Sequence, residues 1–138
     1  MVKVIIGEKG SGKTKLLVEL VREALNADNG DVVVIEKDVK LTYDVPYQAR
    51  LITASDYDIT SYELLKGLLC GIHAGNYDIT HIFVDNFLKL VNDKSSESMS
   101  VFFAWLKQFS EREGIEFVVS ISADASTVPD IVKEFVIN

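Results

Sequence analysis

The chain has little cysteine, and its basic residues are outnumbered by its acidic ones. Its single cysteine, Cys70, excludes an internal disulfide and is typical of a reducing compartment. Fourteen basic residues stand against 21 acidic ones, a net charge of −7, so extensive nucleic-acid binding is not expected, because phosphate backbones bind clustered lysine and arginine. No apolar run approaches the roughly 18 residues of a membrane span, and no secretory segment precedes the first expected strand. We therefore expect a cytoplasmic protein without a membrane span.

The length and the apolar content set the size of the fold. With 138 residues, of which 48% are hydrophobic, the chain can build one full core but not two. No internal repeat, low-complexity tract or linker interrupts it. We therefore expect a single domain covering residues 1–138.

Residues 7–14 read GEKGSGKT and fit the pattern G-x-x-x-x-G-K-[ST]. The preceding residues, VKVIIG, form an apolar β-branched run that predicts a buried strand near 2–6. The residues that follow place apolar side chains at helical spacing and predict a helix over 13–26. A strand, a glycine loop and a helix in this order are the context that a phosphate-binding loop requires.

The chemistry of this loop explains its residue types. Glycines let backbone N–H groups approach phosphate oxygens closely, and the helix N-terminus adds partial positive charge. Lys13 would reach the β- and γ-phosphates, and the Thr14 hydroxyl would bind Mg²⁺. The alternative is an ordinary turn before a helix with a surface lysine. The residues expected to bind the nucleotide here are Gly7, Glu8, Lys9, Gly10, Ser11, Gly12, Lys13, Thr14 and Lys15.

The remaining patterns alternate between strands and helices. Apolar runs predict strands near 31–36, 49–55, 78–87, 115–122 and 134–138. Helical spacing predicts helices over 60–75 and 95–113, and Thr60 and Glu63 stand at capping-box spacing at the start of the first. Its expected buried face carries Leu64, Leu65, Leu68, Leu69 and Ile72. This order predicts an α/β fold, a three-layer α/β/α sandwich around a mostly parallel sheet of about five strands.

A second phosphate-site signal is the sequence IFVD, residues 82–85. It predicts an apolar core strand that ends in Asp85. An aspartate at the carboxyl end of a neighbouring strand lies close to the phosphate loop and can hold Mg²⁺ together with Thr14. The alternative is an aspartate that only terminates a strand.

Residues 7–14 and 82–85 together resemble the Walker A and Walker B motifs of the P-loop NTPase superfamily. The order of the later elements is similar to the RecA/DnaB-like branch, in which an added strand lies between the strands of these two motifs. This resemblance implies a RecA-like core that binds ATP, or another purine nucleoside triphosphate, with Mg²⁺. It also implies that Glu36 activates water, and that Ser122 is a polar sensor residue, with Ser120 or Asp124 as weaker candidates.

One departure from the family pattern bears on activity. Asn86 follows Asp85, where other branches of the superfamily carry a glutamate base. Either Glu36 supplies the base, with Lys13 and Asp85 completing the catalytic set, or hydrolysis is feeble. We expect slow or partner-stimulated hydrolysis, helped by a protein partner or a second copy of the chain. ATP is preferred to GTP because an N-K-x-D guanine motif is absent.

Two alternatives of other classes stay open. A nucleotide-dependent interaction module without useful turnover would account for Asn86 and for the small size of the chain. A small-molecule kinase would use the loop over 38–58 to shape an acceptor pocket, but no arginine-rich lid segment accompanies it.

Overall fold

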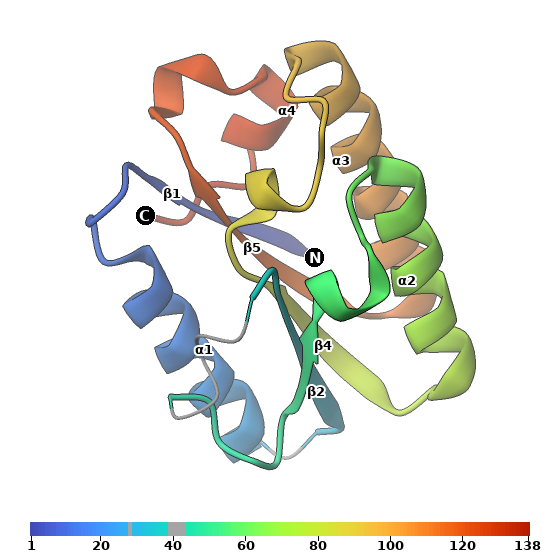
Figure 1. The fold of residues 1–138 in the computed structure, drawn as a ribbon. Helices are drawn as coiled ribbons and strands as arrows, with labels where there is room; N and C mark the ends of the chain where they lie inside the picture. The colour runs from blue at the N-terminus through green and yellow to red at the C-terminus, as the bar shows by residue number, and fades with distance from the viewer. Residues whose placement is uncertain (28, 39–43) are drawn as a thin grey trace.

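The computed structural model describes residues 1–27, 29–38 and 44–138. Its five-stranded sheet has the order β1-β5-β4-β2-β3, and each neighbouring pair is parallel (Figure 1). The strands are β1 (Val2–Gly7), β2 (Asp31–Glu36), β3 (Arg50–Thr53), β4 (Ile79–Val84) and β5 (Glu116–Ser122). The helices are α1 (Lys13–Ala27), α2 (Tyr62–Gly75), α3 (Ser96–Glu113) and α4 (Asp130–Lys133). The expected α/β fold around a parallel sheet is confirmed.

The helices cover both faces of the sheet (Figure 1). On one face, Leu17 and Val21 of α1 pack in a buried cluster with Ile5, Val34 and Phe83 of the strands. On the other face, a larger buried cluster joins α2 and α3 to alternate residues of the same strands. Because the strands are buried on both faces, they read in the sequence as continuous apolar runs instead of alternating ones. The result is the expected three-layer sandwich.

The strand order decides which residues meet at the carboxyl edge of the sheet. Strand β5 lies between β1 and β4, where the family resemblance predicted an added strand. Strand β2 lies on the other side of β4. The ends of β1, β4 and β2 therefore bring three separate segments to one edge: the loop 8–12, Asp85 and Glu36.

The expected last strand, over 134–138, was wrong. The preceding residues form the short helix α4, and the segment after it makes only one isolated bridge, between Val4 and Val136. Phe135 and Ile137 exchange backbone hydrogen bonds with Val4 at 2.8 and 2.9 Å. The apolar residues of this segment therefore cover the outer edge of β1 without continuing the sheet.

The start of α2 also differs from the prediction. Ser61, and not Thr60, is the N-cap residue, and its hydroxyl accepts a hydrogen bond from the Leu64 N–H at 3.2 Å. With this register, Leu65 and Leu69 lie at the centre of the buried face, while Leu64 is 47% exposed. The expected position of Leu64 in the core was therefore wrong, because a run of leucines does not show which ones lie at the edge of the apolar stripe.

Candidate functional site

The loop between β1 and α1 is shaped by its glycines. Gly10 and Gly12 have φ angles of 86° and 87°, a region that residues with side chains rarely adopt. At Gly7 an added Cβ would collide with the Ser11 side chain. The left-handed backbone at Gly10 and Gly12 therefore favours glycine there, and the loop leads into α1 at Lys13. The first N–H groups of α1 have no acceptor within the helix and favour an anion at this end.

Lys13 is a buried cation, only 7% exposed. Its Nζ donates to the Glu8 carbonyl oxygen at 2.9 Å and to the Ser11 hydroxyl at 3.4 Å. Among the residues that the structure describes, no carboxylate lies within ion-pair distance of this ammonium. A buried charge that meets only neutral oxygens is costly unless an anion compensates it.

Asp85 follows the last residue of β4 and is 4% exposed. Its N–H donates to the Ile35 carbonyl at 2.9 Å, which fixes the end of β4 against β2. The Thr14 hydroxyl lies 3.4 and 3.5 Å from its two carboxylate oxygens. The structure therefore brings together the two residues that the sequence proposed as metal ligands, although 71 positions separate them. Within the described chain, the hydrogen-bond partners of this carboxylate are neutral.

Asn86 turns the chain away from the sheet in the left-handed conformation, with φ 52° and ψ 55°. Its side-chain amide donates to Asp85 Oδ2 at 3.3 Å and accepts from the Ser122 hydroxyl at 3.2 Å. A left-handed backbone is tolerated by asparagine better than by most residues with side chains. Asparagine therefore suits this position through its backbone conformation as well as through its side-chain amide.

The three candidate sensor residues have different surroundings. Ser122 is exposed, pairs in register with Gly7 and contacts Asn86. Ser120 is buried and contacts Asp85 and the Asn86 backbone directly, at 2.7 and 2.8 Å. Asp124 lies outside this group and binds Ser126 at the start of a short 3₁₀ turn; those hydrogen bonds lower the pKa of its carboxyl.

Glu36 is the last residue of β2 and is 3% exposed. The register pairs Ile35 with Val84, and continuing it by one residue places Glu36 beside Asp85. The carboxylate proposed as the base therefore belongs to the same edge as Asp85. The remaining loop residues, Glu8, Lys9 and Lys15, are exposed. Residues 39–43, part of the loop over 38–58 expected to shape an acceptor pocket, lie outside the described residues.

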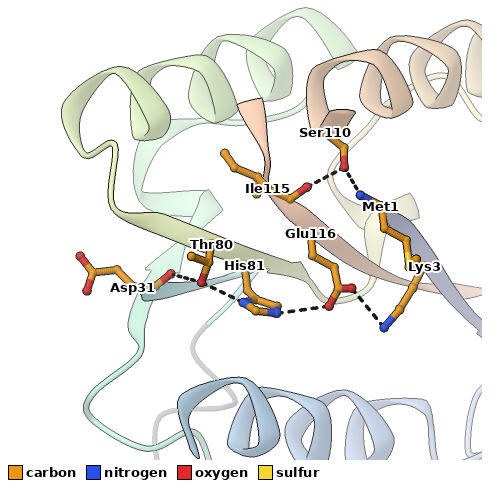
Figure 2. A network of polar contacts seen from close by, with 8 residues as sticks. All are labelled: Met1, Lys3, Asp31, Thr80, His81, Ser110, Ile115 and Glu116. Atoms are coloured by element: carbon orange, nitrogen blue, oxygen red, sulfur yellow. Dashed lines mark hydrogen bonds and ion pairs between the residues drawn. The ribbon is translucent and has the colours of Figure 1, made fainter. Parts of the chain in front are cut away.

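The opposite, amino edge of the sheet carries a second polar network (Figure 2). Glu116 pairs with Lys3 at 3.1 Å and with His81 at 3.2 Å, and His81 Nδ1 lies 2.9 Å from the Thr80 hydroxyl. The other histidine, His73, pairs with Glu113 at 2.7 Å. Across residues 1–27, 29–38 and 44–138, no group of three or more histidine, cysteine or acidic side chains is arranged to hold a metal ion. Each histidine contacts a glutamate of another element, Glu113 for His73 and Glu116 for His81.

Among the helices that the structure describes, none combines the length and apolar character needed to cross a membrane.

Comparison with known proteins gives structural likeness without sequence likeness. No family profile matches the chain, and no curated protein matches it. Among 67 matching chains of solved structures is the flagellar accessory protein FlaH from Methanocaldococcus jannaschii, with a TM-score of 0.65 and 14% identity. The match covers 96% of this chain but 65% of FlaH, so the chain spans just under two thirds of that protein.

A second match is the pCW3 conjugation coupling protein TcpA, whose monomer form was solved with ATPγS. Its TM-score is 0.42 at 16% identity, over 97% of this chain and 46% of TcpA. Of these two matches, only FlaH, with its TM-score of 0.65, bears on the fold. That likeness shows the fold alone: this chain, an α/β fold around a parallel five-stranded sheet, superposes on part of FlaH.

Proposed function

We propose that this chain binds a purine nucleoside triphosphate, most simply ATP, together with Mg²⁺. The observation that carries the proposal is Lys13, a buried ammonium with only neutral partners at the N-terminus of α1. A phosphate group would supply the missing negative charge and would accept hydrogen bonds from the loop and from the helix end. The position of β5 between β1 and β4 favours the RecA/DnaB-like branch of the superfamily.

Each residue of the site has a role in this proposal. The loop 7–15 holds the phosphates, and Lys13 pairs with the phosphate charge. Thr14 and Asp85 fit Mg²⁺ because they offer a hydroxyl and a carboxylate oxygen side by side, the hard ligands that this ion prefers. A bound Mg²⁺ supplies positive charge that stabilises the phosphate oxygens. Glu36 accepts the proton of the attacking water, and Ser122 offers a hydroxyl beside the phosphate loop.

We infer slow or partner-stimulated hydrolysis. Asn86 is an amide, which can orient a water but cannot accept its proton, so the residue after Asp85 supplies no base. We assign the base to Glu36, the buried last residue of β2 at the same edge. The amide at position 86, in place of a second acid, also favours a second candidate, an interaction module in which bound nucleotide changes a partner's contacts without turnover.

The proposal is tested by calorimetric titration of the protein with ATP and with GTP, each in Mg²⁺ and in EDTA. We expect binding in Mg²⁺ and a loss of at least about 100-fold in affinity for Lys13→Ala, because a buried charge-assisted contact disappears. Lys107→Ala, which removes an exposed lysine of α3, is the matched control and should bind as the parent does. Equal affinities of the parent and Lys13→Ala would reject the proposal.

Phosphate release without an acceptor separates the two candidate functions. A parent that binds ATP and releases phosphate is a hydrolase. A parent that binds with the same Mg²⁺ dependence and releases none over hours is an interaction module.

A further inference from the structure

Ser120 is a polar residue inside the apolar run of β5. It is 1% exposed, and its neighbours Val119 and Ile121 belong to the core. A buried hydroxyl is costly unless hydrogen bonds satisfy it, so a serine at this depth is expected to have specific partners. These partners identify what the residue does.

The Ser120 hydroxyl joins two consecutive residues of the segment that follows β4. It donates to Asp85 Oδ1 at 2.7 Å and accepts from the Asn86 N–H at 2.8 Å. One hydroxyl thus uses its donor and an acceptor lone pair at the same time. The register pairs Val84 with Val119, so the next residue of β5 is placed for both contacts.

These contacts determine how the Asp85 carboxylate is presented. Ser120 holds Oδ1, while the Asn86 amide reaches Oδ2 at 3.3 Å. The same hydroxyl fixes the N–H of Asn86 at the point where the backbone enters the left-handed region. The carboxylate is thereby kept from rotating and stays beside the Thr14 hydroxyl.

We propose that Ser120 is a positioning residue for the metal site and that it acts through Asp85. The inference rests on the proposed function, since it concerns how that site holds Mg²⁺. Groups that hydrogen-bond a ligating carboxylate orient it, and their loss typically lowers metal affinity about 10- to 100-fold. Ser120 therefore determines the gain in nucleotide affinity that Mg²⁺ provides, and not the affinity for the nucleotide itself.

The test is calorimetric titration of the parent and of Ser120→Ala with AMP-PNP, a non-hydrolysable ATP analogue, in Mg²⁺ and in EDTA. We expect the Mg²⁺-dependent gain in affinity to fall about 10- to 100-fold in Ser120→Ala, with the affinity in EDTA within a few-fold of the parent. Ser120→Thr, which keeps a hydroxyl, should restore much of the gain. If Ser120→Ala does not fold, Ser120→Cys carries the same test with a weaker donor of similar size.

Ser110 offers a matched control at the opposite edge of the sheet (Figure 2). It is also 1% exposed, and its hydroxyl accepts from the Met1 ammonium at 2.6 Å and donates to the Ile115 carbonyl at 2.5 Å. Ser110→Ala should lower the thermal midpoint of unfolding but leave the Mg²⁺-dependent gain unchanged. This control separates a loss of buried hydrogen bonds from a loss of metal positioning.

Two results would overturn the inference, and they are distinguishable. In the first, the parent gains affinity with Mg²⁺, and Ser120→Ala either shows the same gain or loses affinity equally in Mg²⁺ and in EDTA. This result refutes the role of Ser120 and leaves the proposed function standing. A parent that binds no nucleotide in either buffer refutes the proposed function, and the role of Ser120 with it.

Discussion

The charged side chains at the two edges of the sheet differ in their burial and in their partners. At the amino edge, the partly exposed Glu116 pairs with Lys3 and with His81 (Figure 2). At the carboxyl edge, Lys13 and Asp85 are far more deeply buried, yet their contacts in the described chain are carbonyls, hydroxyls and an amide. Among the described residues, Lys13 and Asp85 have no counter-charge within ion-pair distance, whereas the partly exposed Glu116 has one in Lys3.

The difference agrees with the proposal that the carboxyl edge binds a ligand. Partly exposed ion pairs contribute little, and they are a common way to satisfy charge at a protein surface. A buried charge with neutral partners lowers stability, and such sites are typical of places where a charged ligand completes the arrangement. The carboxyl edge has a cation and an anion in this state, which fits a ligand that carries both phosphate and metal.

The largest effect is expected for Glu36→Gln. If Glu36 activates water, the amide should keep nucleotide affinity within a few-fold, because the side chain keeps its size and its acceptor oxygen. Turnover should fall by about 10²–10⁴-fold, the usual contribution of a positioned base. Phosphate release under single-turnover conditions, at saturating ATP and Mg²⁺, measures the effect.

This prediction requires a parent with measurable hydrolysis. If Glu36→Gln hydrolyses as fast as that parent, Glu36 is not the base, and a partner or a second copy of the chain must provide it.

A smaller effect is expected for Asp85→Asn. The substitution removes one charge from the metal-linked part of binding, so the gain in affinity from Mg²⁺ should fall about 10- to 100-fold. Affinity in EDTA should stay equal or rise slightly, because a negative charge near the phosphates is gone. Titration with ATP in the two buffers gives both values, and equal losses in them would assign Asp85 a structural role.

The sequence was informative where the chemistry is local. Residues 7–14 predict the loop because the positive φ angles at Gly10 and Gly12 and the adjoining strand and helix belong to one continuous stretch. Asp85 and Glu36 could be placed because each ends an apolar run, and the ends of parallel strands meet at one edge. To predict that these two residues lie close to each other, the order of the strands in the sheet was the only further information needed.

Features that depend on register could not be found in this way. Ser120 was a minor candidate because nothing in VVSIS shows that its hydroxyl lies beside the residue after another strand. The left-handed backbone of Asn86 is likewise invisible in the sequence, although an asparagine directly after a core strand is a weak signal. The ion pairs of Glu116 join three strands, β5, β1 and β4, so no single segment carries them.

The smallest effect is expected at the amino edge, for Glu116→Gln. The ion pair with Lys3 is lost, while the amide oxygen can still accept a hydrogen bond from His81, so the free energy of unfolding should fall by roughly 0.2–1 kcal/mol. Urea denaturation measures this loss. At 1 M salt the difference in unfolding free energy between the parent and Glu116→Gln should shrink, because salt screens the charges of Glu116 and its partners in the parent. Nucleotide affinity should stay within about two-fold of the parent, since β1, β5 and β4 remain paired between Glu116 and the carboxyl edge. A tenfold change in that affinity would show that the two edges are coupled. The amino edge could then no longer be regarded as purely structural, and the contrast in charge would not identify the carboxyl edge as the binding edge.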